Sequence, residues 1–339
     1  MTFLGTKLPI IQAPMAGSQD SKLAIAVCNA GGLGSLGCAV LSADQLRAEV
    51  AIFRNATSGP LNLNFFVHRP PHVDAERAAR WRDRVAKYYA ELSVERPSTP
   101  GPSRTPFDEA TCALVEELRP EVVSFHFGLP SEALVERVKK SGAKILSSAT
   151  TVAEAVWLQA HGADAVIAQG SEAGGHRGMF LTDDVATQVG LFALLPQIVD
   201  AIRLPVIASG GIADARGVRA AFALGASAVQ VGTAYLHCPE SKIPEAHREA
   251  LLNATDDATV LTNVFTGRPA RGIKNRLVTE LGPMNTDAPE FPLAAIETGP
   301  LRATGNADVL PLWSGQAGGL VRASMSAADL TRMLAQGLP

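Results

Sequence analysis

Two histidines stand where a general base would be useful. His126 ends an apolar run, and His176 follows the tripeptide AGG at residues 173–175, with Arg177 beside it. An imidazole titrates near neutral pH, so it can accept a proton or, once protonated, hold an anion. The two glycines let the backbone approach a flat ligand closely. The competing interpretations are a buried structural histidine for His126 and a surface-loop histidine for His176.

Two glycine-containing turns are of the kind that holds a phosphate. The run SGGIAD at residues 209–214 leads from a strand-like into a helix-like pattern, and Gly232 and Thr233 follow another apolar run. Unpaired backbone N–H groups at such turns, with a helix dipole behind them, favour an anion. The simpler alternative is that the glycines only permit tight turns. Two such turns at successive positions favour a phosphate site.

Strand alternation predicts where the His126 ring points. Successive side chains of a strand face opposite sides, so His126 shares one face with Val122 and Ser124. The large apolar residues of the other face, expected to pack against helices, are Val123, Phe125 and Phe127. We therefore expect His126 to point inward.

The elements that position these residues form a repeating pattern. The candidate strands are Pro9–Met15, Gly32–Gly37, Leu61–Val67, Glu121–Gly128, Lys144–Ala149, Ala165–Gly170, Pro205–Gly211 and Ala228–Leu236. The candidate helices between them are Ser21–Asn29, Ser42–Ala56, Phe107–Leu118, Ser131–Ser141, Thr151–His161, Gly190–Ile202 and Asp214–Leu224. Eight strands alternating with helices predict an α/β fold with parallel strands, and the count favours a closed (β/α)8 TIM barrel. In such a barrel the active site lies at the carboxyl ends of the strands, where the histidines and both turns fall.

An open dinucleotide-binding sheet is the alternative to a barrel. The sequence GLGSLG at residues 32–37 matches G-x-G-x-x-G. Its glycines lie inside the second apolar run and do not open a helix, so the match is weak. We interpret them as positions where two backbones pack closely.

Two segments interrupt the pattern. Residues 68–106 contain a candidate helix, Asp74–Ser93, whose apolar stripe consists of Trp81, Val85, Tyr88 and Leu92. The second interruption follows the eighth strand. We expect residues 1–236 to form the barrel, residues 237–306 a small cap domain inserted after the eighth strand, and residues 307–339 a segment that returns to the barrel.

Composition excludes several classes of protein. The 339 residues carry a formal charge of −3 and no long basic run, which disfavours nucleic-acid binding. We expect no membrane span, no signal peptide and a cytoplasmic location. The four cysteines, at 28, 38, 112 and 238, show no C-x-x-C pair or zinc spacing, so we expect buried free thiols and no metal site. G-x-S-x-G, P-loop and H-E-x-x-H motifs are absent from the sequence.

A set of motifs resembles the nitronate monooxygenase family, formerly called 2-nitropropane dioxygenases, and its class I branch. The motifs are QAPMAG at residues 12–17, GGLG at 31–34, SFHFG at 124–128, GSEAGGHRG at 170–178 and WSGQ at 313–316. The resemblance covers nearly the whole chain. Each motif alone is shared with other flavin barrels, whereas the combination is specific.

The resemblance implies an enzyme that binds FMN non-covalently and oxidises alkyl nitronates with O2 to an aldehyde plus nitrite or nitrate. Propionate 3-nitronate is the expected substrate, with some nitroalkanes. His176 would be the base for neutral nitroalkanes, and His126 a second active-site group. The expected FMN-binding residues are Pro14, Met15, Asn64, Gln169, Gly174, Gly210, Gly211, Gln230, Val231, Gly232, Thr233 and Gln316.

One departure from the family concerns tyrosine. Family members often line the substrate pocket with tyrosines from the cap and the tail, whereas this chain contains only Tyr88, Tyr89 and Tyr235. An NAD(P)H-dependent flavin reductase, of the enoyl-thioester or quinone type, shares the barrel and several motifs and stays open as an alternative. So does a flavin- or phosphate-binding barrel without catalysis. The expected partners are a small-molecule substrate and O2; the sequence does not determine the oligomeric state.

Overall fold

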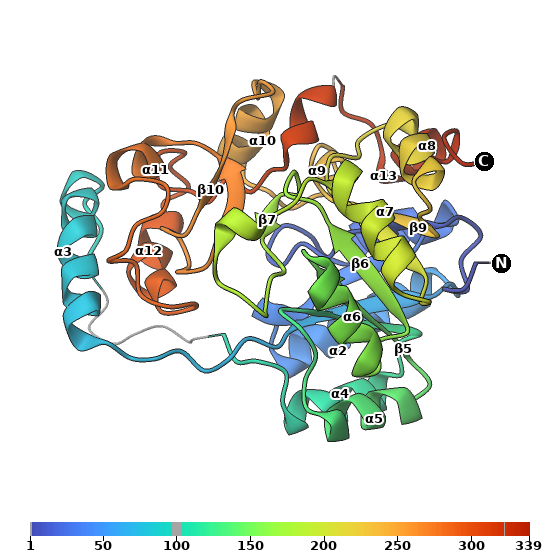
Figure 1. The fold of residues 1–339 in the computed structure, drawn as a ribbon. Coiled ribbons are helices and arrows are strands. Elements are labelled where there is room, and N and C mark those ends of the chain that lie inside the picture. The colour runs from blue at the N-terminus through green and yellow to red at the C-terminus, as the bar shows by residue number, and fades with distance from the viewer. Residues whose placement is uncertain (1, 97–103, 322) are drawn as a thin grey trace.

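The computed structural model describes residues 2–96, 104–321 and 323–339 (Figure 1). Eight parallel strands form the barrel: β1 Ile10–Gln12, β2 Gly34–Gly37, β3 Leu61–Phe66, β4 Val122–His126, β5 Lys144–Ala149, β6 Ala165–Gln169, β8 Val206–Ser209 and β9 Ala228–Val231. β1 pairs with β9. The ring closes next to β2, where Leu33 donates to the Ile10 carbonyl at 2.8 Å and accepts from Gln12 at 3.0 Å. The predicted TIM barrel is confirmed.

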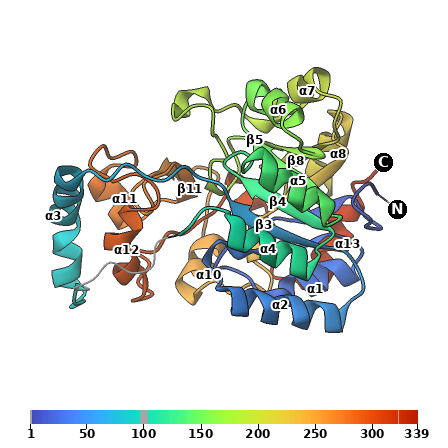
Figure 2. The ribbon, with the colours of Figure 1, turned by 90° about the horizontal axis from the view of Figure 1, so that it is seen from below.

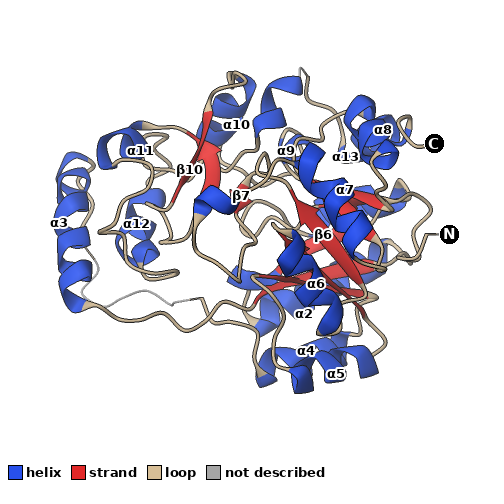
Figure 3. Cartoon of the chain, in the orientation of Figure 1, coloured by secondary structure: helices blue, strands red, loops and turns tan. Residues whose placement is uncertain are grey.

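Helices cover the outside of this barrel (Figure 3). They are α1 Ser21–Asn29, α2 Ala43–Ala56, α4 Glu109–Leu118, α5 Glu132–Lys140, α6 Val152–Ala160, α7 Leu191–Ala201 and α8 Ala215–Ala223. Short 3-10 turns occur at Cys38–Val40, Val185–Thr187 and Gln316–Leu320. The local sequence sets the helix starts: Ser42 and Gln45 form a reciprocal capping box before α2, and Thr151 accepts from the Glu154 N–H before α6.

The two faces of β4 separate as alternation predicts. Val122 packs in the barrel interior, whereas Val123 and Phe125 pack in the layer between strands and helices. Phe127 departs from the prediction. Its backbone adopts a φ of 76°, which reverses the alternation, and its ring lies 5.6 Å from that of Phe291 instead of against the helices.

The glycines of the second strand pack closely against neighbouring backbone, as we expected. A Cβ at Gly34 would overlap the backbone of Ala24 in α1, and one at Gly37 would overlap the backbone of Ala16. These glycines serve close packing of the strand on α1 and on the loop before it. The open dinucleotide-binding sheet is excluded because β1 closes the ring between β9 and Leu33.

Two strand predictions need correction. The eighth strand ends at Val231, and Thr233–Leu236 form a helical turn, α9. The segment expected as a loop after β6 contains a two-residue strand, β7 Gly175–His176. It pairs antiparallel with β11 Ala270–Ile273, which pairs with β10 Thr259–Thr262.

A second body stands beside the mouth of the barrel. It contains β10 and β11 with the helices α11 Arg276–Leu281 and α12 Ala294–Arg302, while α10 Glu245–Leu252 lies between it and the barrel. Helix α3, Ala75–Glu91, packs on this second body, far from α2 and α4, the helices that precede and follow it in the sequence (Figures 1 and 2). The predicted stripe is confirmed: Trp81, Val85 and Tyr88 are buried there and Leu92 packs beside them. The expected domain boundaries stay a prediction, to which the structure adds α3 as a cap element.

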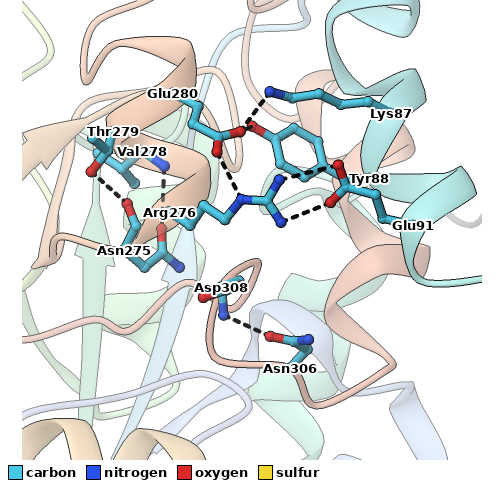
Figure 4. A network of polar contacts seen from close by, with 10 residues as sticks. All are labelled: Lys87, Tyr88, Glu91, Asn275, Arg276, Val278, Thr279, Glu280, Asn306 and Asp308. Carbon is cyan, nitrogen blue, oxygen red and sulfur yellow. Dashed lines mark hydrogen bonds and ion pairs between the residues drawn. The ribbon is translucent and has the colours of Figure 1, made fainter.

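Charged side chains join α3 to α11 along the edge of that apolar contact (Figure 4). Arg276 pairs with Glu91 at 2.7 Å and with Glu280 at 2.7 Å. Glu280 also accepts from Lys87 at 2.5 Å and from the Tyr88 hydroxyl at 2.8 Å. These contacts, led by the Lys87 hydrogen bond, lower the pKa of Glu280 to about 2. The network fixes the register of α3 on the cap.

The last segment crosses back over the barrel. Ile273 donates to the Leu312 carbonyl at 2.8 Å, and Gly315 donates to the Thr233 hydroxyl at 2.9 Å. Helix α13, Ala327–Ala335, then packs against α1 and α8 through an apolar face. Among the described residues, every helix is too short or too polar to cross a bilayer.

Candidate active site

A cavity of about 1270 Å³, counted out to its open mouth, lies at the carboxyl ends of the barrel strands below the cap. Most of the predicted site residues line it: Pro14, Met15, Asn64, His126, Gln169, Gly174, His176, Gly210, Gly211, Gln230, Gly232 and Thr233. Two predicted residues do not. The Val231 side chain packs in the layer between strands and helices, and the Gln316 side chain is exposed, while its neighbours Gly315 and Ala317 reach the wall.

His176 lies where the barrel meets the cap. Its place on β7 is set by pairing with Ala270, and its Nε2 lies 3.0 Å from the Thr266 hydroxyl. The Thr266 oxygen is also 3.5 Å from the Arg268 carbonyl, which can only accept a hydrogen bond. When the hydroxyl donates to that carbonyl, it accepts from Nε2–H of His176, which leaves the lone pair on Nδ1.

The surroundings of His176 keep its imidazole neutral. The rings of Phe66, Phe127, Phe291 and Trp313 lie 6.0, 6.0, 5.3 and 5.6 Å from it. Burial by these neighbours lowers the pKa of His176 well below its usual range, and the positive charge of Arg104 lowers it further. The imidazole is therefore unprotonated at pH 7, and a negative charge formed beside it in the cavity would stabilise its protonated form.

His126 positions the strand that carries His176. Its Nε2 lies 3.1 Å from the His176 carbonyl, which can only accept, so this nitrogen donates. Its Nδ1 then accepts from the Ser148 hydroxyl at 3.2 Å. Burial lowers the pKa of His126 to about 4. Because both nitrogens are engaged, the geometry gives His126 a positioning contact with the backbone of His176.

Gln169 and Asn64 are also engaged with neighbouring protein groups. Gln169 donates to the His176 carbonyl at 3.1 Å and accepts from the Gly178 N–H at 2.7 Å. The Asn64 amide donates to the carbonyl and hydroxyl oxygens of Ser124 at 3.1 and 3.0 Å. Gln169 keeps one N–H, and Asn64 keeps its carbonyl oxygen, for a ligand in the cavity.

The two glycine turns leave backbone donors unused. The N–H groups of Gly210, Gly211 and Gly232 donate to no acceptor in the described part of the chain. Gly210 and Gly211 have φ values of 111° and 71°, which glycine adopts without strain. The N-terminus of α8 is not free, because the Asp214 side chain accepts from the N–H groups of Arg216 and Gly217. The donors that this turn leaves without a partner are therefore its glycine amides, not the helix end.

Gln230 carries an unpaired acceptor at the same site. Its side-chain oxygen is buried, lines the cavity wall, and has no hydrogen-bond partner within residues 2–96, 104–321 and 323–339. A buried amide oxygen without a donor is costly, so its position indicates a ligand that supplies an N–H or O–H group.

Sequence reasoning missed the aromatic and cationic parts of the wall. Phe66, Arg104 and Trp313 line the cavity, and Phe291 packs on the His176 ring. Phe66 lies in a predicted strand and Trp313 belongs to the WSGQ motif, but neither was assigned to the site. Arg104 and Phe291 come from the polar break and the cap, where no local pattern marks them. No tyrosine lies on the cavity wall in the part of the chain that the structure describes.

Two further histidines and the four cysteines are buried. His68 and His247 are buried, and burial lowers the pKa of each to about 4. All four cysteines are buried free thiols, as predicted. The described residues contain no cluster of His, Cys, Asp and Glu fit for a metal ion.

Comparison with known proteins identifies a family. The family described as "Nitronate monooxygenase" matches residues 1–337. The chain is 42% identical to the nitronate monooxygenase of Paraburkholderia phytofirmans, over 100% of this chain and 94% of that protein. It is 42% identical to the nitronate monooxygenase of Pseudomonas aeruginosa, over 99% and 97% of the two chains.

Solved structures agree with the sequence match. A nitroalkane oxidase from Streptomyces ansochromogenes superposes with a TM-score of 0.90 and 38% identity, over 98% of this chain and 96% of that one. FabK from Thermotoga maritima superposes with a TM-score of 0.75 and 28% identity, over 98% and 92%.

Proposed function

Because the chain belongs to the nitronate monooxygenase family and is an enzyme of that type, we propose that it uses FMN and O2 to oxidise alkyl nitronates, and some nitroalkanes, to an aldehyde plus nitrite or nitrate. Propionate 3-nitronate is the substrate we expect. The observation that carries the proposal is the neutral His176 imidazole, which faces the same cavity as the unused amides of Gly210 and Gly211.

The cavity fits a flavin mononucleotide. The unused N–H groups of Gly210, Gly211 and Gly232 suit its phosphate, and the Gln230 oxygen suits an N–H of its ring edge. Gly174 lets the C-terminal segment pack closely on this wall, because a Cβ there would lie 2.5 Å from the Gly315 nitrogen. When bound, FMN supplies the electron acceptor and the reaction with O2.

The work left to the protein is to prepare and hold the nitronate. A neutral nitroalkane loses its α-proton to the His176 imidazole, which then stands as a cation beside the nitronate anion. The positive charges of Arg268 and Arg302, which also lower the pKa of His176, stabilise an anion in this place. The surrounding phenylalanine and tryptophan rings exclude water and strengthen these interactions.

The test starts with the purified yellow protein. Heat-released flavin is identified by mass, and oxygen consumption is followed with propionate 3-nitronate and with nitroethane, together with assays of nitrite and nitrate. In parallel, NADH is added without oxygen while the flavin band is watched.

We expect released FMN, nitronate-dependent oxygen uptake, and no bleaching by NADH on the timescale of turnover. Rapid bleaching by NADH without nitronate oxidation would replace this proposal by a flavin reductase. Bound FMN with neither reaction would indicate a flavin-binding barrel that lacks both activities.

A further inference from the structure

Arg104 is a cation on the cavity wall without a protein counter-charge. Its side chain lines the cavity, and its Nη1 is buried with no hydrogen-bond partner among the described residues. Neither Arg104 nor Arg302 forms an ion pair within the described chain. The charge of Arg302 is the one that lowers the pKa of Arg104. Each arginine therefore repels the other, with no carboxylate to compensate.

Two other buried arginines near the site, Arg177 and Arg271, form hydrogen bonds with the protein. Arg177 donates to the carbonyls of Gly170 and Gln169, each at 2.8 Å, and to the Gln188 side chain at 2.7 Å. Arg271 donates to the Ser171 carbonyl at 2.9 Å. Unlike these side chains, Arg104 has donors left over and faces open space.

The missing counter-charge has an energetic meaning. Burial, and then the charge of Arg302, lower the pKa of Arg104 to about 10, so the guanidinium is still charged at neutral pH. A buried cation without partners is costly, and an anion that enters the cavity offsets this cost on binding. A guanidinium presents a planar fork of donors that matches a carboxylate.

Arg104 and His176 face the same aromatic side chain. The His176 ring lies 5.3 Å, and the Arg104 guanidinium carbon 5.7 Å, from the centroid of the Phe291 ring. A ligand beside His176 therefore reaches the surroundings of Arg104 with a short chain. The rings of Phe66 and Trp313, which line the same cavity, offer an apolar surface for methylene groups.

We propose that Arg104, reinforced by Arg302, binds a second anionic group of the substrate, a carboxylate at the far end of a short alkyl chain from the nitronate. The inference rests on the proposed function and extends it. His176 removes the proton from the carbon that bears the nitro group, and Arg104 determines the preference for nitronates that carry a carboxylate over those that do not. Arg104 lines the cavity and Arg302 acts on it by charge, and among the described residues no tyrosine lines the wall.

The test compares two nitronates on the flavin-loaded protein. Propionate 3-nitronate carries the carboxylate, and propyl-1-nitronate has a methyl group in its place. The variant Arg104→Met keeps the length of the side chain and removes its charge. We expect kcat/KM for propionate 3-nitronate to fall about 10- to 100-fold, mostly through KM, as for the loss of one charge-assisted contact. For propyl-1-nitronate the change should stay within about threefold.

Two further variants separate recognition from folding. Arg104→Lys keeps the charge and should recover part of the preference for the carboxylated substrate. Arg84→Met removes an exposed arginine of α3, paired with Asp287 away from the cavity, and should leave both substrates unaffected. Flavin content is measured for every variant.

A binding measurement keeps this test separate from that of the proposed function. Succinate, which carries two anionic groups on a short chain, should raise the melting temperature of the wild type and of Arg84→Met but not of Arg104→Met. If the wild type oxidises neither nitronate, the proposed function fails, and the succinate result alone decides on the anion site. Equal losses on both nitronates, or a succinate effect that survives Arg104→Met, would overturn the assignment.

Discussion

Replacing His176 by asparagine should separate the two classes of substrate. A neutral nitroalkane must lose an α-proton before it can be oxidised, whereas a preformed nitronate has already lost it. Asparagine can keep a hydrogen bond in the place of the 3.0 Å contact with Thr266, but it cannot take a proton. The substitution therefore removes the base while it preserves most of the packing against Phe291.

The expected size of the effect follows from these roles. Loss of a general base costs about 10²- to 10⁴-fold, so kcat/KM for nitroethane should fall by that factor. The nitronate loses only a contact with the imidazole, about 1–3 kcal/mol, or about 5- to 150-fold. Because burial keeps the pKa of His176 far below neutrality, the wild-type rate with nitroethane should not fall between pH 7.5 and 6.

The assay is oxygen uptake with nitroethane and with ethyl nitronate at equal flavin content. His126→Asn is the matched control, since His126 touches the carbonyl of His176 and not its ring. That variant should slow both substrates to a similar extent. Equal losses on both substrates in His176→Asn, with flavin fully bound, would refute the assignment of the base. A loss confined to nitroethane in His126→Asn would transfer the role to that residue.

Three further predictions address the cofactor, the cap and the pH dependence. Gly211→Asp should purify without flavin, because the added carboxylate would repel the phosphate. Gly211→Ala introduces the same backbone strain, at a φ of 71°, without the charge and should retain more flavin. Absorbance near 450 nm measures the flavin content of both variants, and an aspartate variant with full flavin content would refute the phosphate site. Trp81→Ala should cost about 3–5 kcal/mol in the unfolding of the cap, since its ring is fully buried between α3 and α12; urea titration measures this, and a loss below about 1 kcal/mol would contradict the packing. Burial lowers the pKa values of His68, His126 and His247 to about 4, against about 6.5 when unfolded, so the unfolded chain binds protons that the folded chain excludes. Stability should therefore be constant above about pH 6.5 and fall as the pH drops towards 4, and an equal urea midpoint at pH 7 and pH 5 would contradict this.

The sequence by itself determined the barrel and much of its rim. The strands and helices follow from short-range patterns, such as the alternation of Val122 and Val123 and the capping box at Ser42. Once eight parallel strands are inferred, their carboxyl ends must meet, and this brings His126, Gln169 and Gly210 to one cavity. These features depend on residues a few positions apart, which is the range over which periodicity and capping act.

Only the tertiary structure decided what surrounds the base. The bond from His176 to Thr266 joins residues 90 positions apart, and the Phe291 ring comes from the cap. The sequence likewise predicted the apolar stripe of α3 but not that it faces the cap, because periodicity shows that a face is buried and not against what. Arg104 carries no local signal. Folding places it on the cavity wall without an ion pair among the described residues, and such a balance of charge exists only after distant segments have packed together.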